Sequence, residues 1–290
     1  MIKDSTGLRV FHVINFIWLT LLSLMMFIPF LIILSTSFSS ETDITLHGYA
    51  FLPRVWSLDA FHFVFTQGTA GRGYIISITV TVIGTLLAVI ITTMAGYALS
   101  RQSLKYRGFF ALAYYFTMVF NAGLVPWFII VSDIGISNSI WAMILPMCFN
   151  PFLMLLMRNH FRGIPDSLVE SAKIDGAGEF MIYLRIMLPI AIPGVAVITL
   201  FYMLAYWNDW WMALLFIKNK QIYPLQFLLR QILANIQFAA MNPSMVNLGA
   251  IPQETVKMAT CVVTIGPIIF VYPFIQRYFV KGITIGAVKG

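Results

Sequence analysis

Charged residues are scarce in this 290-residue chain. Asp, Glu, Lys and Arg together make up 10% of it, against about 25% in typical soluble domains. Hydrophobic residues make up 60%, and the mean hydropathy is +0.87. So few charges could not cover the surface of a soluble protein of this size. The composition therefore excludes an ordinary soluble domain and predicts that a lipid bilayer surrounds much of the chain.

Residues that build metal sites and disulfides are equally scarce. The two cysteines, Cys148 and Cys261, lie in apolar runs and form no CxxC pair, which argues against a structural disulfide or a zinc site. The four histidines are scattered and form no HExxH motif. We therefore expect no catalytic residue and no metal ligand, and we expect that the chain is not an enzyme.

A nucleotide-binding loop is also missing. The stretch from Gly282 to Gly286 has the glycine spacing of GxxxxGK[ST], but Ala287 follows where the motif needs lysine. The chain should bind no cofactor itself, so any ATP and magnesium would be held by a partner.

Long apolar runs are abundant, and each is long enough to cross a bilayer. Spanning segments of this length must be helices, because backbone groups in hydrocarbon have to pair within their own segment. We predict an all-α membrane protein, formed by residues 1–290 as a single transmembrane domain. The first run should be an anchor rather than a cleaved signal peptide. The six predicted spans are residues 14–38, 74–100, 108–131, 138–157, 191–217 and 258–276.

The net charge of +7 comes mainly from basic residues in short loops. They cluster before the first span, after the last span, and in the second and fourth loops. The positive-inside rule places these regions in the cytoplasm, so both termini should be cytoplasmic. The same pattern makes the basic residues topology determinants and argues against nucleic acid as a partner.

The fourth loop, residues 158–190, is far more polar than its neighbours. Ser167 and Glu170 have the spacing of a capping box, which predicts a short helix from about Leu168 to Asp175. Gly176 and Gly178 should then form a corner. A second amphipathic stretch with helical spacing follows and should end at Pro189, where the fifth span opens. It carries Phe180, Tyr183, Leu184 and Met187. The first helix could dock into a groove on a partner or lie on the membrane surface.

This loop resembles the EAA loop of ABC importer permeases, which reads Glu-Ala-Ala, three residues, Gly, nine residues, then Ile-x-Leu-Pro. Ser171 replaces the first alanine, a small residue for a small residue, and Asp175 and Ala177 match the Asp-Gly-Ala of the sugar-transporting branch. The matching positions are Glu170, Ala172, Gly176, Ile186, Leu188 and Pro189.

The resemblance extends beyond the loop. Residues 96–101 are similar to the end of the corresponding helix in maltose-type permeases, and residues 282–290 to their C-terminal tail. Residues 207–211 and 223–226 resemble a sub-branch associated with oligosaccharides and uronate-containing glycans.

The resemblance implies a type I ABC importer permease in a bacterial cytoplasmic membrane. Its partners would be a cytoplasmic ATPase dimer, a second homologous permease and an extracytoplasmic solute-binding protein. The fourth loop would be the coupling helix, with Glu170 paired to a basic group on the ATPase and Gly176 supplying the corner. The C-terminal tail, with Gly286 and Lys289, would reach toward the ATPase. The residues implied in docking are Glu170, Ser171, Ala172, Asp175, Gly176 and Ala177.

A polar and aromatic cluster in the fifth run suggests where a sugar could pass. A carboxylate such as Asp209 is costly at mid-membrane, so it should face a cavity or a partner. Aromatic side chains nearby suit the C–H faces of a sugar, although an interfacial aromatic belt is an equal alternative. A rival reading is a cation-coupled secondary transporter that uses Asp209. The candidate path residues are Asn121, Tyr206, Trp207, Asn208, Asp209 and Trp210.

Overall fold

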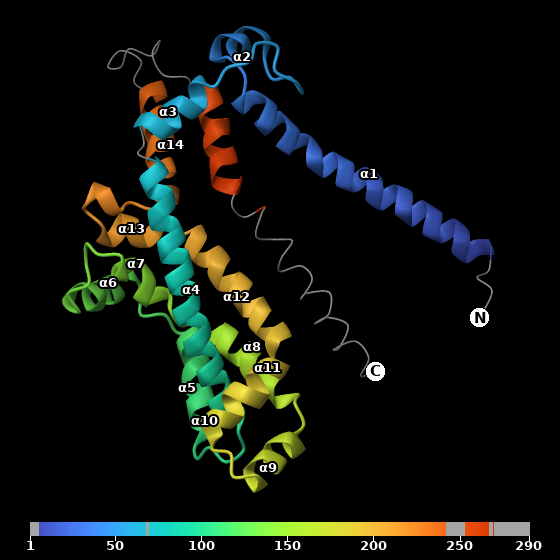
Figure 1. The fold of residues 1–290 in the computed structure, drawn as a ribbon. Helices are drawn as coiled ribbons and strands as arrows, with labels where there is room; N and C mark the ends of the chain where they lie inside the picture. The colour runs from blue at the N-terminus through green and yellow to red at the C-terminus, as the bar shows by residue number, and fades with distance from the viewer. Residues whose placement is uncertain (1–5, 68–69, 242–252, 267–268, 270–290) are drawn as a thin grey trace. The chain divides into compact units, whose positions relative to one another are not determined.

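The computed structural model describes residues 6–67, 70–241, 253–266 and 269. Within these residues the chain is helical and contains no strand; Ser39 and Trp56 form a single isolated bridge. The all-α prediction is therefore confirmed. The chain divides into two compact units, residues 1–69 with 231–266 and residues 70–230 with 267–290. Figure 1 shows the elements of each unit.

The first unit contains α1 (Thr6–Ser37), α2 (Glu41–His47), α3 (Asp59–Gln67) and a helix over residues 253–266. Nearly all of α1 exposes apolar side chains, as a helix solvated by lipid does. The Glu41 carboxylate caps the helix at residue 253. It accepts hydrogen bonds from the backbone N–H groups of Gln253, Glu254 and Thr255, each at 2.9 Å. This side chain thus binds a helix more than 200 residues away in sequence.

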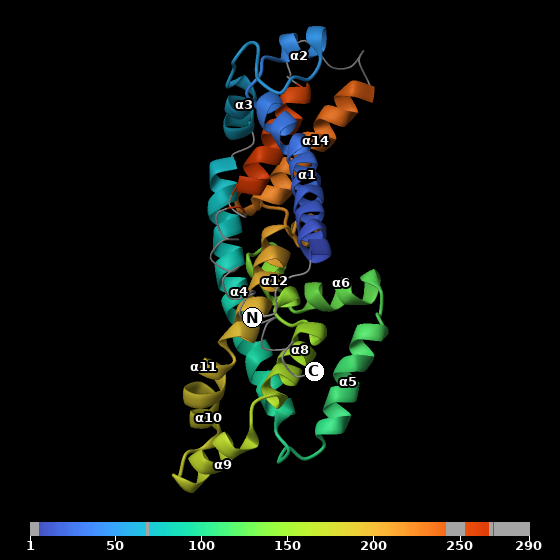
Figure 2. The same ribbon diagram turned by 90° about the vertical axis from the view of Figure 1, so that its right-hand side faces the viewer.

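The second unit is built around α4 (Ala70–Ser100), with α8 (Pro151–Arg162) and α12 (Ile192–Trp207) packed along it (Figure 2). Small residues on α4 permit a close approach. At Gly84, a Cβ atom would lie only 2.6 Å from the nearest ring atom of Tyr206 on α12. The Tyr206 hydroxyl donates to the carbonyl of Ile144 at 2.9 Å. The buried core of this unit therefore depends on a glycine opposite a large aromatic ring.

Shorter helices complete the second unit. Many of their large apolar side chains are exposed, which is the surface expected of a protein in lipid. They are α5 (Arg107–Val119), α6 (Leu124–Asp133), α7 (Trp141–Ile144), η1 (Leu145–Met147), α13 (Trp211–Phe216), η3 (Lys220–Ile222) and the start of α14 (Leu225–Met241), whose residues 231–241 belong to the first unit.

The spans are less regular than the sequence predicts. Two helices of the described residues, Val10–Ser37 and Ala70–Ser100, are long and apolar enough to cross a membrane. The number of such spans rises to five if each of three sharply bent helix pairs counts as one span. The predicted span 108–131 is broken into α5 and α6 at an angle of 115°. Gly123, at φ 88°, lies directly before α6 and supplies the left-handed backbone that the turn needs.

The other predicted spans fare differently. The span 138–157 bends by 50° between η1 and α8, where Pro151 begins a new helix. The span 191–217 is shortened, because α12 ends at Trp207. Of the span 258–276, the structure describes residues 258–266 and 269, and the rest lies outside the described residues. The count of six therefore stays a prediction.

Candidate coupling site

The predicted helix in the fourth loop is α9 (Asp166–Ile174). It begins two residues earlier than the capping box predicts. Pro165 precedes the helix with φ −57° and ψ 132°, and no side chain caps its first turn. The capping-box prediction was therefore wrong. Proline already fixes the entry of the chain, which places Ser167 inside the helix, where it cannot act as the N-cap.

The helix ends in the corner expected at Gly176. This residue adopts φ 81°, which only glycine takes without cost. The N–H of Ala177 donates to the carbonyl of Ala172 at 2.9 Å, and the N–H of Gly176 donates to that of Lys173 at 3.0 Å. These two bonds form a Schellman motif, which satisfies the last carbonyl groups of the helix. Gly178 does not take part, since its φ is −72°.

The second amphipathic stretch forms α10 (Glu179–Ile182), a π-helical turn η2 (Tyr183–Met187) and α11 (Leu188–Ile190). Its buried residues are Ile182, Tyr183 and Met187, whereas the predicted Phe180 and Leu184 are exposed. A π turn has more residues than an α-helical turn, so it changes which side chains face inward. The predicted apolar stripe was therefore correct at Tyr183 and Met187 and wrong at Phe180 and Leu184. The helix continues past Pro189 and breaks at Ala191, with a bend of 83° before α12.

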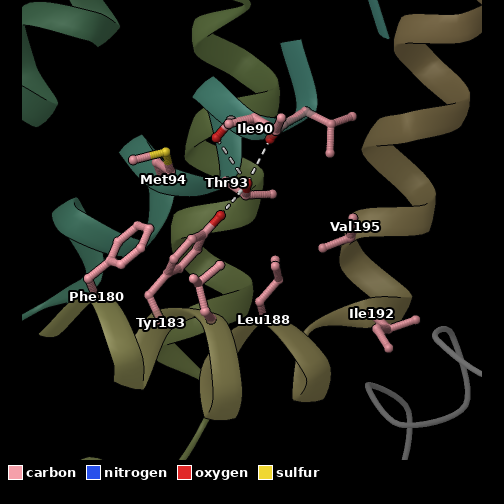
Figure 3. Close-up of a pocket in the computed structure, with 10 residues that line it drawn as sticks. Ile90, Thr93, Met94, Phe180, Tyr183, Leu188, Ile192 and Val195 are labelled. Carbon is pink, nitrogen blue, oxygen red and sulfur yellow. Dashed lines mark hydrogen bonds between the residues drawn. The ribbon is translucent and has the colours of Figure 1, made fainter. Parts of the chain in front are cut away.

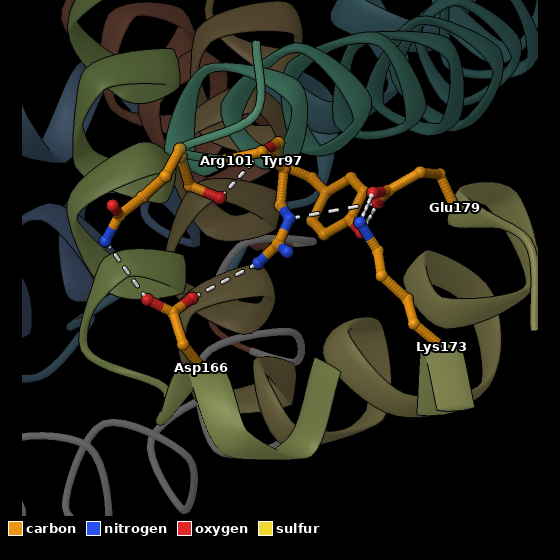
Figure 4. A network of polar contacts seen from close by, with 7 residues as sticks. Tyr97, Arg101, Asp166, Lys173 and Glu179 are labelled. Carbon is orange, nitrogen blue, oxygen red and sulfur yellow. Dashed lines mark hydrogen bonds and ion pairs between the residues drawn. The ribbon is translucent and has the colours of Figure 1, made fainter. Parts of the chain in front are cut away.

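A network of polar side chains joins this loop to the C-terminal end of α4 (Figure 4). Arg101, directly after α4, pairs with Asp166 at 3.3 Å and with Glu179 at 3.8 Å. The Tyr97 hydroxyl donates to Glu179 at 2.6 Å. Lys173, at the end of α9, pairs with Glu179 at 2.6 Å. Both ends of α9 are thus connected to α4, so a displacement of α9 would be transmitted to that long helix.

Glu179 stays ionised at neutral pH. It lies in the polar loop, outside the predicted spans. The hydrogen bond from Lys173, followed by that from Tyr97, holds the pKa of Glu179 below its ordinary value of 4.5, although partial burial opposes this. The network therefore combines two carboxylates, Asp166 and Glu179, with two cations, Lys173 and Arg101.

The outer face of α9 combines an unpaired acid with exposed apolar side chains. Glu170 is exposed and makes no hydrogen bond or ion pair within the described part of the chain. Ile174 is 86% exposed and Leu168 is 42% exposed, while Val169 and Ala172 pack inward. A helix with its inner face already buried and apolar residues on its outer face is suited to a partner groove.

The remaining residues implied in docking lie around this face. Ser171, Asp175 and Gly176 are exposed, Ala177 is half-buried, and Ala172 is buried against the core of its own unit. Ala172 therefore contacts this chain rather than offering its side chain to a partner. Gly286 and Lys289 lie outside the described residues.

An apolar cavity of about 430 Å³ lies between α4 and the segment from α10 to α12 (Figure 3). Figure 3 shows the Thr93 hydroxyl 2.8 Å from the hydroxyl of Tyr183 and also bonded to the backbone carbonyl groups of Val89 and Ile90. The other side chains around it are aliphatic, aromatic or methionine. Such a lining offers few hydrogen bonds to sugar hydroxyl groups, so this cavity is a poor candidate for a sugar site.

The predicted path residues do not all face one space. The Tyr206 hydroxyl is used within the core, and the Asn208 amide donates to the carbonyl of Leu204 at 2.9 Å. Asn121 is exposed, and its side-chain oxygen accepts from the N–H of Gly123 at 2.9 Å in the break between α5 and α6. It therefore stabilises a turn.

Asp209 lies after the end of α12 and is half-buried. Its two carboxylate oxygens accept from the N–H of Met212 at 3.3 and 3.4 Å, so it caps α13. Trp207 is buried near Tyr74, with ring centroids 6.2 Å apart. Trp210 is half-buried under the guanidinium of Arg230. In the part of the chain that the structure describes, no group of three His, Cys, Asp or Glu side chains could hold a metal.

Sequence reasoning missed several of these residues. Glu179 and the exposed Ile174 carry no motif of their own. Tyr97 and Arg101 lie in the stretch 96–101 that resembles maltose-type permeases, but nothing in the sequence pairs them with Glu179. The residues of an ion pair such as Arg101 and Glu179 are 78 positions apart, and no local sequence pattern predicts that they meet. The exposed apolar positions of α9 could have been found from its helical periodicity, because Leu168 and Ile174 lie off the face formed by Val169 and Ala172.

Comparison with known proteins identifies the family of the chain. The family model described as "Binding-protein-dependent transport system inner membrane component" matches residues 89–285. The polygalacturonan/rhamnogalacturonan transport system permease protein YtcP of Bacillus subtilis is 36% identical over 285 residues, which cover 97% of this chain and 99% of that protein. Protein LplC of the same organism is 36% identical over 282 residues, covering 97% and 96%.

A solved structure of a transporter is also similar to this chain. The crystal structure of a bacterial ABC transporter involved in the import of the acidic polysaccharide alginate contains a chain with 31% identity and a TM-score of 0.83. The match covers 96% of this chain and 100% of that one. The matched family region includes α9, its corner and the network with α4. The chain thus belongs to the family of binding-protein-dependent transport system inner membrane components.

Proposed function

We propose that this chain is one of two homologous permease subunits of an ATP-driven importer, and that its substrate is an oligosaccharide. The substrate class is supported by relatives whose names state polygalacturonan/rhamnogalacturonan and arabinooligosaccharide transport. The observation that carries the mechanism is the outer face of α9. Glu170 forms no ion pair there with any described residue and Ile174 is 86% exposed, while polar contacts connect both ends of the helix to α4.

In this proposal α9 docks into a cleft of a cytoplasmic ATPase dimer, which holds the ATP and magnesium. Exposed Ile174 and Leu168 would fill the cleft, and Glu170 would pair with a basic group of the ATPase. Closure of the dimer would move α9. Because Asp166 and Glu179 bind Arg101, the movement would reach α4, whose 31 residues extend over about 46 Å. That length is enough to cross the membrane.

The other parts of the proposal follow from the charge pattern and the family. Both termini and α9 lie in the bacterial cytoplasm, and the chain crosses the inner membrane several times. A solute-binding protein delivers the substrate on the opposite side. The C-terminal tail, with Gly286 and Lys289, reaches toward the ATPase. The cation-coupled alternative draws no support from the relatives, and Asp209, on which it depends, is engaged in capping α13.

The test compares two glycine variants in the complete transporter, reconstituted in proteoliposomes with its ATPase, its second permease and its binding protein. Gly176→Arg forces a side chain onto a backbone at φ 81° at the corner beside the docking face. It should abolish ATP-driven oligosaccharide uptake while the subunit still inserts into the membrane. Gly178→Arg is the matched control, since Gly178 has φ −72° and open space around it.

Uptake by the Gly176→Arg transporter at the wild-type rate would remove the coupling role of α9. Transport by the chain alone, driven by a cation gradient without ATP, would overturn the proposed function as a whole.

A further inference from the structure

An arginine is stacked on a tryptophan near the extracytoplasmic end predicted for the second unit. The guanidinium carbon of Arg230, in α14, lies 3.6 Å from the centroid of the Trp210 ring, in the turn between α12 and α13. Arg230 is exposed and Trp210 is half-buried. Trp211 packs edge-on against Trp210 at 5.4 Å and is itself 39% exposed. Two aromatic rings and a cation thus share one surface.

Arg230 has no acidic partner among the residues that the structure describes. Within the described residues, no carboxylate lies within 4.0 Å of its guanidinium. The nearest acid in the sequence of the turn, Asp209, already accepts hydrogen bonds from the N–H of Met212. Stacking on a ring fixes the plane of the guanidinium and leaves its in-plane N–H donors available. Such a fork matches the two oxygens of a carboxylate.

This pair lies at the end of α4 opposite the coupling network. Trp207, three residues before Trp210, packs near Tyr74, and the N–H of Leu225 donates to the hydroxyl of Ser77 at 2.9 Å. Both contacts are close to the N-terminus of α4. Tyr97 of the network is 23 residues further along the helix, a rise of about 35 Å. If α9 is cytoplasmic, Arg230 faces the side from which substrate arrives.

Other exposed cations accompany Arg230 in this part of the unit. Arg72 is in the first turns of α4, and Lys218 and Lys220 flank Asn219 in the loop before α14. None of them forms an ion pair within the described part of the chain. A group of cations attracts anionic solutes over several ångströms without orienting them. A stacked arginine, by contrast, can hold one carboxylate in a fixed orientation.

We propose that Arg230 and Trp210 form a subsite for a carboxylated sugar, of the uronate class, in the oligosaccharide that this chain carries. The guanidinium of Arg230 binds the carboxylate bidentately, and the exposed face of Trp211 packs against the sugar ring. This inference rests on the proposed function and narrows its substrate class. It makes Arg230 a specificity-determining residue, which neither the motif in the fourth loop nor the carboxylate of Asp209 would indicate.

The test measures ATP-dependent uptake of a galacturonate trisaccharide and of its methyl-esterified, uncharged form by the complete reconstituted transporter. Arg230→Gln should lower uptake of the acid about tenfold or more and leave uptake of the ester within about twofold. Arg230→Lys, which keeps the charge and loses the fork, should give an intermediate loss for the acid. Arg72→Gln is the matched control, because it removes the same charge from an arginine that is stacked on no ring in the described part of the chain.

Three outcomes would overturn the subsite alone. One is an equal loss for acid and ester in Arg230→Gln. The second is an equal loss for the acid in Arg230→Gln and Arg72→Gln, which would indicate only a diffuse field. The third is a wild-type transporter that imports neutral oligosaccharides and no acidic ones, which would leave the proposed function standing. A wild-type transporter that imports no glycan at all would end both proposals. Basal ATPase activity and the amount of subunit in the membrane check that each variant is folded.

Discussion

Glu179 is the residue on which the contacts between α9, α10 and α4 converge. Its carboxylate accepts from Tyr97 and pairs with Lys173 and Arg101. Its pKa is held below 4.5, chiefly by the hydrogen bond from Lys173. A carboxylate whose pKa is lower in the folded state stabilises the fold above its ordinary pKa, and this stabilisation is lost as pH falls through the lowered value. The network should therefore be intact from about pH 5 to about pH 8, where Glu179 is ionised and Lys173 is protonated.

This can be measured as the difference in free energy of unfolding between the wild type and Glu179→Gln. The difference should be constant from about pH 8 to about pH 5 and should shrink below pH 4.5, the ordinary value for the group. Lys173 and Glu179 are 43% and 45% exposed, so solvent screening limits their pair to about 1 kcal/mol or less. A difference that disappears between pH 8 and pH 6 would contradict the assignment.

At the scale of the elements, the packing of α4 against α12 depends on Gly84. A Cβ atom there would lie between 2.6 and 2.9 Å from three ring atoms of Tyr206, whose hydroxyl is held by the carbonyl of Ile144. Gly84→Ala should therefore destabilise the protein by about 1–3 kcal/mol through overpacking, seen as a lower Tm in detergent. Gly71, in the same helix, has open space around it. Gly71→Ala is the control and should be neutral or stabilising by about 0.5–1 kcal/mol.

The Glu41 contact is a second feature of this scale. One carboxylate accepts from three backbone N–H groups at the start of the helix 253–266 and from the hydroxyl of Thr255 at 2.7 Å. Glu41→Ala removes the shared acceptor, so the first unit should lose about 1–3 kcal/mol, and the amides of residues 253–255 should exchange hydrogen faster. Glu41→Gln keeps one carbonyl oxygen and should lose less.

Asp59→Asn serves as the control for that experiment. Asp59 also lies in a first helical turn of the same unit, but among the described residues its side chain bonds only to the nearby Ser57. Unchanged exchange at residues 253–255 in Glu41→Ala would refute the capping role.

At the scale of the whole second unit, the two ends of α4 contact different sites: the polar network with α9 at one end and the proposed sugar subsite at the other. Tyr97 and the adjoining Arg101 meet the loop with α9, while Tyr74 and Ser77 contact the segments that present Trp210 and Arg230. One continuous helix therefore spans the distance between the proposed motor contact and the proposed substrate contact. Rigid helices transmit displacement along their axis, so removal of one link at the end that meets α9 should weaken uptake at the other end.

Tyr97→Phe tests this connection with a minimal change. It deletes the hydroxyl that donates to Glu179 at 2.6 Å and keeps the ring that packs against Phe161 and Tyr183. ATP-driven uptake should fall by about tenfold, with the amount of subunit in the membrane unchanged. Tyr115 is 55% exposed on α5, so Tyr115→Phe should have no effect. Equal uptake in both variants would show that the hydroxyl takes no part in coupling.

Much of the fold follows from local patterns that the sequence displays. Apolar runs predicted helices in a membrane, and Gly176 predicted the corner, since the Schellman motif needs a residue at positive φ. The predictions failed where local geometry depends on neighbours. The π turn at Tyr183–Met187 and the break between α5 and α6 alter the direction of the chain without changing its hydrophobic character.

The sequence by itself determined that this chain is helical, belongs in a lipid bilayer, and carries a polar loop with a glycine corner, because composition and short-range spacing set these properties. Only the tertiary structure decided which charged side chains meet which partners. Arg101 with Glu179, Glu41 with residues 253–255, and Trp210 with Arg230 are brought together by helix packing. Contacts between distant positions depend on how helices pack, and no periodicity along the chain encodes them.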